Sequence, residues 1–291
     1  MSRIDILNQQ VPTIAIVGTG LLGGSIGLGL RAAGFEGRII GVGRRTSTVR
    51  RAADLGCVDE GTTNLGAAVE RCSLIVLATP LGRFCSLLRQ IAAHDHDALI
   101  ITDVGSTKQQ VCAEAHQVLP APSRFVGSHP MAGSEQRGAE AARSDLFQGK
   151  PCIITPQRDT DPGAVQTVET VWSVLGMRLM RMTAKQHDQQ TAVISHLPHA
   201  TAVLLIQIAS QLGGYPIAST GFRDTTRLAS SNPPMRADVM MANRDQILYA
   251  LDALSQHVQD LRCRLADGDV NAVRDLLNRA RQSREDWLQQ S

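Results

Sequence analysis

The chain has 291 residues, of which 29 are Lys or Arg and 27 are Asp or Glu, so its formal net charge is +2. This length favours two domains. An aromatic content of 3% and a near-neutral charge argue against the stacking platforms of single-strand binders and the basic surfaces of duplex binders. Nucleic acid is therefore not an expected partner.

In the first half, short apolar runs alternate with helical patterns. The runs predict strands at 11–17, 38–42, 74–78, 98–102, 124–127 and 151–155. The helical patterns lie at 21–33, 46–55, 81–93, 106–119 and 161–175. Strands that are apolar on both faces and alternate with helices indicate a parallel sheet covered on both sides. The predicted fold is an α/β, Rossmann-like, doubly wound sheet.

From residue 184 onward the sequence contains only helical patterns, separated by glycine and proline turns. This predicts an all-α C-terminal domain. Its first helical pattern, 192–209, is apolar nearly all round, which is typical of a buried core or of a dimer interface. The predicted domains are a dinucleotide-binding domain over 11–183 and a helical domain over 184–291.

The cellular location follows from the cysteines and the apolar segments. None of the six cysteines forms a CxxC pair, which favours reduced, buried thiols in the cytoplasm. The N-terminus is polar and lacks the apolar region of an export signal. The most apolar stretch, 200–209, is about half the length that spans a bilayer. We expect a cytoplasmic protein with no membrane partner.

A Gly-x-Gly-x-x-Gly motif stands between the first predicted strand and the first helix. Its glycines permit a tight turn, close approach of a pyrophosphate and close helix–strand packing. A flexible glycine turn is the alternative, but the strand–turn–helix context favours dinucleotide binding. The candidate cofactor residues are Gly18, Gly20, Leu21, Leu22 and Gly23.

The end of the second predicted strand bears on the choice of cofactor. Enzymes that select NAD usually have an acidic residue there for the ribose hydroxyls. This chain has Gly43 followed by Arg44 and Arg45. Two guanidiniums suit a 2′-phosphate, although a solvated basic loop is the alternative. The sequence favours NADP over NAD.

Polar residues follow three later strands, whose ends meet at one edge of such a sheet. Thr79 and Pro80 follow the third strand and are further candidate cofactor residues, with Pro80 at the first position of a helix. A plain structural turn is the alternative for these two residues. Ser106 is expected to cap the next helix and to lie near the nicotinamide. His129, in a Gly/Ser/Pro-rich loop, is either structural or a base that takes a hydroxyl proton. Glu135 lies six residues further on.

Two polar clusters stand in the helical half. His196 and His199 have the spacing of a metal pair, but no carboxylate or cysteine ligands accompany them, so no metal is expected. Arg223, Asp224 and Arg227 form either a surface loop with local ion pairs or a carboxylate clamp.

Five segments together resemble the prephenate/arogenate dehydrogenase family of tyrosine biosynthesis. They are VGTGLLGGSIGLGLR, TDVGSTK, FVGSHPMAGSEQRGAE, SHLPHA and GFRDTTRLASSNP, in that order. The resemblance extends from about residue 13 to residue 285. The first segment is common to many dehydrogenases, whereas the combination of the last three is specific.

The resemblance implies a Rossmann-like domain, a helical dimerisation domain and an NAD(P)-dependent oxidative decarboxylation of a cyclohexadienol. By this resemblance His129 accepts the hydroxyl proton, and Ser106 orients the histidine and the substrate. Arg227 pairs with a substrate carboxylate, and His199 and Glu135 line the substrate side chain. A homodimer is implied as well.

Several activities fit these residues. His199 is typical of members that use prephenate and release 4-hydroxyphenylpyruvate, while an arogenate or dual cyclohexadienyl dehydrogenase is the alternative. A β-hydroxyacid dehydrogenase is disfavoured, because such enzymes typically rely on a lysine in the helical half. The only lysine after residue 150 is Lys185, which lies at the domain junction. A non-catalytic NADP sensor is disfavoured because Ser106, His129 and Arg227 are all present.

Overall fold

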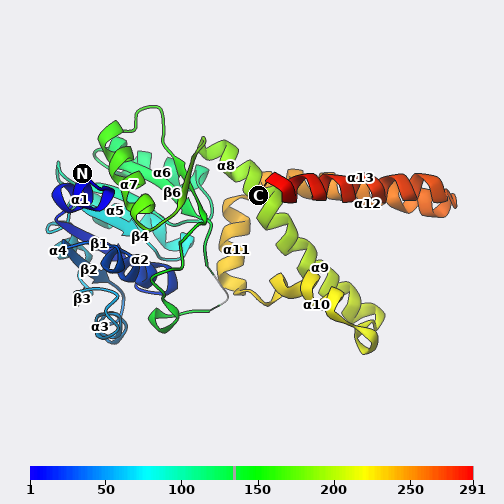
Figure 1. The fold of residues 1–291 in the computed structure, drawn as a ribbon, viewed down its shortest axis with the longest axis horizontal. Helices are drawn as coiled ribbons and strands as arrows, with labels where there is room; N and C mark the ends of the chain where they lie inside the picture. Colours follow the sequence, from blue (N-terminus) through cyan, green and yellow to red (C-terminus); the bar gives the residue numbers. More distant parts are fainter. Residues whose placement is uncertain (134–135, 291) are drawn as a thin grey trace. The chain divides into compact units, whose positions relative to one another are not determined.

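The computed structural model describes residues 1–133 and 136–290 (Figure 1). The chain divides into two compact units, residues 1–243 and 244–291. The first unit contains a sheet, the helices that cover it and a series of further helices up to Ala242. The second unit is a pair of helices, α12 (Arg244–Ala266) and α13 (Val270–Gln290), which pack against each other.

The sheet has eight strands in the order β3-β2-β1-β4-β5-β6-β7-β8. They are β1 (Thr13–Val17), β2 (Arg38–Val42), β3 (Glu60–Thr62), β4 (Leu74–Leu77), β5 (Ile100–Asp103), β6 (Phe125–Pro130), β7 (Pro151–Thr155) and β8 (Arg178–Arg181). Strands β1 to β6 are mutually parallel. The strand order reverses between β1 and β4, and ligands of doubly wound sheets bind beyond the carboxyl ends of the strands at this point.

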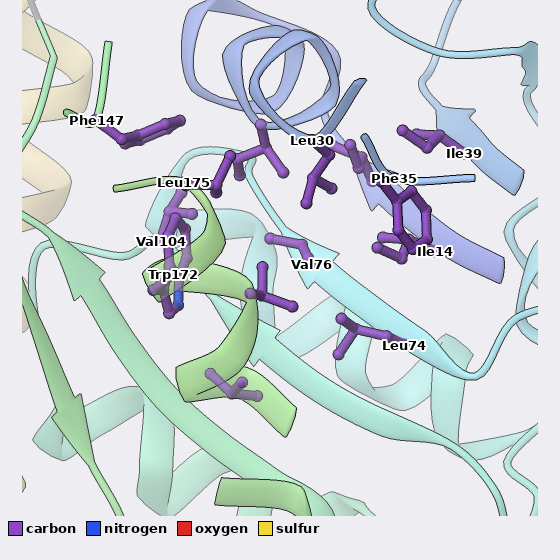
Figure 2. Packing of buried hydrophobic residues seen from close by; sticks show 14 of the residues in the cluster. Ile14, Leu30, Phe35, Ile39, Leu74, Val76, Val104, Phe147, Trp172 and Leu175 are labelled. Atoms are coloured by element: carbon purple, nitrogen blue, oxygen red, sulfur yellow. The ribbon is translucent and has the colours of Figure 1, made fainter. Parts of the chain in front are cut away.

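The sheet is covered on both sides because successive residues of each strand point to opposite faces. In β1, Ile14 and Ile16 belong to one buried cluster, whereas Ala15 and Val17 belong to the other. The first cluster, drawn in Figure 2, is completed by α1 (Arg3–Gln10), α2 (Leu21–Ala32), α3 (Thr46–Asp54) and α7 (Pro162–Val174). The second is completed by α4 (Leu65–Val69), α5 (Phe84–Ala92) and α6 (Gln109–Val118).

The predicted doubly wound α/β fold is confirmed, with two corrections. Strand β7 runs antiparallel to β6, and β8 is parallel to β7, so the sheet is mostly and not wholly parallel. The structure also adds β3, β8, α1 and α4, which are short or polar and therefore carry weak patterns. Because an apolar run has the same composition in either direction, the sequence could not reveal the reversed strand.

A series of helices follows the sheet within the first unit. They are α8 (Ala184–Thr191), the π-helical turn η4 (Ala192–His196), α9 (Leu197–Leu212), the 3-10 turn η5 (Tyr215–Ile217), α10 (Thr220–Thr226), the 3-10 turn η6 (Arg227–Ser230) and α11 (Pro233–Ala242). Within residues 184–290 the structure contains no strand, so the predicted all-α C-terminal region is confirmed. Pro198 has no N–H for the usual helical bond to Ile194, and the wider π-turn lies directly before it.

The continuous helical segment from Ala184 to Leu212 is long and apolar enough, by length and composition alone, to cross a membrane. A helix of a soluble protein can pass the same test. Here the first part of the segment carries His187, Asp188 and His196, which are buried and hydrogen-bonded to polar groups of the same unit. The rest exposes apolar side chains, among them Leu204 and Ile208. The first part of the segment is therefore buried against the rest of the same unit. The exposed apolar face of α9 is typical of a surface that binds a partner.

All six cysteines are free thiols. Cys57, Cys72, Cys112 and Cys152 are buried, as expected, whereas Cys85 is half-buried and Cys263 is exposed. Burial raises the pKa of Cys72 to about 12 and that of Cys112 to about 11, so these thiols act as small apolar side chains.

Candidate functional site

The glycine-rich turn between β1 and α2 can be built only from glycine at two of its positions. Gly18 has a φ of +103°, and a Cβ there would lie 2.6 Å from the carbonyl oxygen of Ala78. Its N–H donates to the carbonyl of Val42, which joins the turn to β2. A Cβ on Gly23 would lie 1.9 Å from the carbonyl oxygen of Gly18. These two glycines therefore make the tight turn and the close helix packing that the motif predicts.

Gly20 has a different role, because a Cβ there would meet nothing within 4 Å. It is the N-cap of α2, and no side chain caps the N–H groups of that helix. Leu21 and Leu22 begin the helix. Beside them, the hydroxyl oxygen of Thr19 is buried and has no hydrogen-bond partner among the described residues. An open helix N-terminus with an unused hydroxyl fits a pyrophosphate, so these residues suit a dinucleotide.

Arg44 and Arg45 lie just beyond β2, in the segment that leads into α3. Both are exposed, and neither forms an ion pair within the described part of the chain. Arg45 is the N-cap of α3. The two guanidiniums are thus available at the end of the strand where a dinucleotide places its adenosine ribose.

The structure places Thr79 and Pro80 after β4, next to the turn between β1 and α2. The methyl group of Thr79 is 3.0 Å from the position that a Cβ of Gly18 would occupy. Pro80 is the N-cap of the 3-10 turn η1 (Leu81–Arg83), which precedes α5. The prediction that Pro80 is the first residue of a helix is wrong by one position. A cap has non-helical backbone angles, and the ψ of 144° at Pro80 satisfies this condition.

The most distinctive feature of the site is a chain of hydrogen bonds that begins at His129. The predicted loop position of this residue is wrong, because β6 extends to Pro130 and pairs His129 with Ile153 of β7. The Nδ1 of His129 lies 2.8 Å from Nε2 of His187 on α8. The Nδ1 of His187 lies 2.7 Å from a carboxylate oxygen of Asp188. His187 and Asp188 are both buried, whereas His129 retains some exposed surface. We call these three residues the His-His-Asp chain.

The carboxylate at the end of the His-His-Asp chain determines where the protons lie. An ionised carboxylate only accepts hydrogen bonds, so Nδ1–H of His187 must donate to Asp188. In a neutral ring this leaves Nε2 of His187 as an acceptor, which receives Nδ1–H of His129. Nε2 of His129 is then unprotonated. The chain therefore presents a basic nitrogen to whatever lies in front of His129.

Asp188 is held in the ionised form by a second set of donors. Its carboxylate accepts the backbone N–H groups of Lys108 at 2.7 Å and Gln109 at 2.8 Å. Burial raises the pKa of Asp188, but the hydrogen bonds from His187 and from these two N–H groups outweigh burial and lower it. Asp188 thus caps the N-terminus of α6 from a distant part of the sequence.

This remote cap corrects the prediction for Ser106. The helix begins at Gln109, three residues later than predicted, and its N-cap is Lys108. Ser106 is half-buried in the loop between β5 and α6, beside Thr107, whose buried hydroxyl oxygen has no partner among the described residues. The loop that carries Ser106 is therefore anchored to the His-His-Asp chain through Asp188.

The same loop is fixed from its other end by a buried ion pair. The Lys108 ammonium contacts the Asp103 carboxylate, and neither side chain is exposed. Asp103 also accepts the backbone N–H groups of Gly105 at 2.7 Å and Ser128 at 3.0 Å. Because Ser128 precedes His129 on β6, the carboxylate of Asp103 ties the Ser106 loop to the strand that carries His129.

The environment of His129 keeps its ring neutral. Burial, followed by the charges of His187, Lys108 and His196, lowers the pKa of His129 well below its ordinary value of 6.5. His196 is itself buried, which lowers its pKa to about 4, and its Nδ1 lies 3.1 Å from the amide nitrogen of Asn243. A neutral His129 can accept a proton at physiological pH.

The helical residues of the site gather around His199 on α9. Its Nδ1–H donates to the carbonyl of Ser195 at 3.0 Å, and its Nε2 is buried without a partner among the described residues. Burial lowers the pKa of His199, and the charges of Arg236 and Arg227 lower it further. Arg227, in η6, is exposed. The predicted clamp thus contributes one guanidinium near His199.

Not every predicted residue is brought into this cluster. Arg223 and Asp224 are exposed on α10, and neither is found in an ion pair in the described ranges. Glu135, predicted to line the substrate side chain, lies outside the described residues.

Sequence reasoning missed His187, Asp188, Lys108 and Arg236. The His–Asp dipeptide at 187–188 is an ordinary pair of polar residues near a helix start, and its partners are 58 and 80 residues away. One signal was available in the sequence. If an apolar helical segment is buried, a histidine and a carboxylate near its start need hydrogen-bond partners elsewhere in the protein.

Comparison with known proteins places both halves of the chain in one family. Residues 26–181 match the prephenate dehydrogenase nucleotide-binding domain, and residues 183–279 match the prephenate dehydrogenase dimerization domain. A prephenate dehydrogenase of Bacillus subtilis is 36% identical over 91% of this chain and 73% of its own length. A cyclohexadienyl dehydrogenase of Zymomonas mobilis is 33% identical over 88% of this chain and 90% of its own.

Solved structures agree. A prephenate dehydrogenase from Aquifex aeolicus in complex with hydroxyphenyl propionate and NAD+ has a TM-score of 0.88 and 31% identity, over 94% of this chain and 97% of its own. An arogenate dehydrogenase from Synechocystis has a TM-score of 0.83 and 31% identity, over 94% of this chain and 99% of its own.

Proposed function

Because this chain belongs to the prephenate dehydrogenase family, we propose that it oxidises and decarboxylates prephenate to 4-hydroxyphenylpyruvate with His129 as the base. It is an NAD(P)+-dependent oxidoreductase. The observation that carries the role of His129 is the His-His-Asp chain, which leaves Nε2 of His129 unprotonated at the sheet edge that also bears the glycine-rich turn. An arogenate or dual cyclohexadienyl activity is the alternative, and relatives of both kinds are similar to this chain.

The chemistry needs one group that accepts a proton and others that hold an anion. When bound, a nicotinamide would supply the hydride acceptor for the ring carbon that bears the 4-hydroxyl. Nε2 of His129 takes the hydroxyl proton as the C=O bond forms. The ring carboxylate then leaves as carbon dioxide, its bonding electrons aromatise the ring, and His129 can return the proton to the phenolate. Arg227 pairs with a substrate carboxylate, and the loop that carries Ser106 is held in place by Asp188 and Asp103.

We also propose that NADP+ is preferred to NAD+. Arg44 and Arg45 are exposed and unpaired in the described structure, at the end of β2 where an acidic side chain would otherwise bind the ribose. A 2′-phosphate would add charge-assisted hydrogen bonds to one or both guanidiniums.

Initial rates of reduced-cofactor formation test both proposals. We expect turnover of prephenate with NADP+ as the better cofactor, when prephenate and arogenate are each measured with NAD+ and NADP+. Replacing Arg44 and Arg45 together by glutamine should raise the KM for NADP+ by about 10- to 100-fold, because charge-assisted bonds are lost, and leave the KM for NAD+ nearly unchanged. Arg50→Gln, on the exposed side of α3, is the matched control. Turnover of arogenate alone would overturn the proposed substrate.

A second copy of this chain is the proposed partner of the helical region. The dimerization-domain match includes α9, whose side chains Val203, Leu204, Ile208 and Leu212 are each at least 40% exposed. Such a row of exposed apolar side chains is unusual in a monomer and typical of an obligate homodimer interface.

Replacing Ile208 by glutamate should shift the protein from dimer to monomer. The carboxylate would be buried without a partner in the interface, which costs about 3–5 kcal/mol and weakens the dimer by more than 100-fold. Light scattering across a dilution series measures the change, with Gln166→Glu on the exposed side of α7 as the charge-matched control. A dimer that is equally stable in both variants would remove α9 from the interface.

A further inference from the structure

Lys108 carries a buried ammonium group to which the proposed reaction gives no direct role. Its side chain and that of its partner Asp103 are both fully shielded from solvent. A buried ion pair contributes little net stability, because desolvation of the two charges offsets most of their attraction. An apolar pair of similar volume often stabilises a protein as well or better. Stability alone therefore does not explain this pair.

The backbone around the ion pair allows its groups to approach closely. A Cβ on Gly105 would lie 2.7 Å from Oδ2 of Asp103, so only glycine brings its N–H this near to the carboxylate. The aliphatic stem of Lys108 lies against Gly127 of β6, where a Cβ would lie 3.4 Å from its Cδ. Neither glycine has a positive φ. Close packing, and not an unusual backbone conformation, is thus the reason for glycine beside the pair.

The side chain of Lys108 acts on the strand that carries the base. The Asp103 carboxylate that contacts the ammonium also accepts the backbone N–H of Ser128 at 3.0 Å. Ser128 directly precedes His129 on β6. Burial raises the pKa of Asp103, and the charge of Lys108 is the largest influence that opposes this rise. The ammonium therefore helps to keep Asp103 an acceptor for the backbone beside His129.

The backbone of Lys108 acts on the helix that carries the partner of the base. Its N–H donates to Oδ1 of Asp188 at 2.7 Å, and the same oxygen accepts Nδ1–H of His187. Nε2 of His187 in turn lies 2.8 Å from Nδ1 of His129. The contacts close on themselves, and we call them the hydrogen-bond cycle, which runs through Lys108, Asp103, Ser128, His129, His187 and Asp188.

We propose that Lys108 is a positioning residue for the general base, because it holds β6 through its side chain and α8 through its backbone at the separation that the bond between His129 and His187 requires. This inference rests on the proposed function, in which His129 is the base. A hydrogen bond between two imidazole rings weakens steeply when its geometry is lost, and the tautomer of His129 is then no longer fixed. Lys108 acts through Asp103 and Asp188 and not on the substrate itself.

Replacing Lys108 by methionine and Asp103 by asparagine in one double variant tests this role. The double variant leaves no unpaired buried charge, so it should fold, with a melting temperature lowered by about 10 °C at most. The new amide oxygen cannot serve both backbone N–H groups that the carboxylate binds, so the loop or β6 shifts. We expect kcat for prephenate to fall by about 100-fold, the loss that a displacement of about 1 Å can cause.

Binding of the cofactor and a surface variant serve as controls. The Kd of NADP+ should stay within about threefold of wild type, because the glycine-rich turn is untouched. Lys185→Met, exposed on α8, is the matched control and should keep the wild-type kcat. A double variant with wild-type kcat would overturn the proposal. Equal losses of kcat and of NADP+ affinity would show a collapsed site and overturn it as well.

Nitrogen-15 NMR of histidine-labelled protein gives a readout that needs no substrate. In wild type at pH 7, His129 should have a protonated Nδ1 and an unprotonated Nε2, and its signals are assigned by their loss in His129→Asn. In the double variant we expect signals of both tautomers, because Nδ1–H of His129 no longer has a fixed acceptor. A purely structural role of Lys108 would lower the melting temperature and leave the tautomer unchanged. That result would overturn the proposal.

The single variants show whether Lys108 acts through Asp103. If it does, Lys108→Met, Asp103→Asn and the double variant should lower kcat by similar factors, since each breaks the same contact. Losses that multiply in the double variant would show that the two residues act independently, and would overturn this route. If a single variant is too unstable to purify, the double variant and its NMR spectrum decide the question alone.

The wild-type protein distinguishes this inference from the proposed function. If wild type does not oxidise prephenate, the proposed function fails, and the tautomer of His129 still tests the hydrogen-bond cycle. If wild type oxidises prephenate and the double variant retains its kcat and its single tautomer, the role of Lys108 alone fails.

Discussion

Replacing His129 by asparagine is expected to lower kcat for prephenate oxidation by about 10²- to 10⁴-fold, the range that a general base contributes. Asparagine keeps a polar group within reach of His187 but offers no nitrogen lone pair to the substrate hydroxyl. The affinity for NADP+ should change little, because the glycine-rich turn is untouched. Stopped-flow single turnovers with saturating cofactor measure the effect, and His116→Asn on the surface of α6 is the control.

The pH profile of the wild-type enzyme provides an independent check on the same residue. His129 is active when neutral, and its pKa is lowered well below 6.5, so kcat/KM should stay constant as the pH falls through 6.5. The decline should come only in more acidic solution, where the ring becomes protonated. Retention of full activity by His129→Asn would exclude His129 as the base, and a half-loss of wild-type kcat/KM near pH 6.5 would contradict the burial argument.

Replacing Asp188 by asparagine should have an effect of similar size, although Asp188 lies two hydrogen bonds from the reacting atoms. The amide NH₂ of asparagine can donate to Nδ1 of His187, which then carries its proton on Nε2. That proton would be donated to Nδ1 of His129, and the proton of His129 would move to Nε2, where it blocks proton acceptance. We expect kcat to fall by about 10²- to 10⁴-fold, as when a buried aspartate that fixes a catalytic histidine tautomer is changed to asparagine.

Two further readouts show whether Asp188 acts by positioning. The asparagine side chain accepts fewer hydrogen bonds from the N-terminus of α6, so the melting temperature should fall by several degrees. The Kd values of NADP+ and of 4-hydroxyphenylpyruvate should nevertheless stay within about threefold of wild type, less than a lost charge-assisted bond would cause. Asp54→Asn, exposed on α3, is the control. Equal losses of binding and kcat would show a collapsed site instead of a reversed tautomer.

The parts of the fold that rest on local patterns were predictable from the sequence. The glycine-rich turn is one such part, because Gly18 and Gly23 are required by backbone geometry within a few residues of each other. The alternation of buried strands and helices is another. The direction of β7 was not predictable, since an apolar run has no polarity along the chain and its pairing with β6 depends on tertiary contacts.

The candidate site was predictable only in part. His129 could be singled out because it follows an apolar run in a segment rich in Gly, Ser and Pro, although this segment continues β6 and does not form a loop at His129. Its partners could not, because His187 and Asp188 meet β6 and α6 only after the chain has folded. The start of α6 was misplaced for the same reason: a serine looks like a local cap, whereas the actual acceptor is a carboxylate 80 residues away. Remote caps and buried ion pairs leave no spacing signature.

The bonds from Asp188 to α6 and from His187 to β6 have a consequence for recombining this protein with its relatives. The two family matches meet between residues 181 and 183, which is the natural junction at which to exchange halves. A chimera joined there would take His129 from one parent and the His–Asp pair from the other. The compact unit extends instead to Asn243, whose amide also donates to the carbonyl of Asp188. Exchanges that keep residues 1–243 from a single parent preserve the hydrogen bonds that fix the protons of His129. In exchanges made at the boundary between the two family matches, residues from different parents have to form these bonds again.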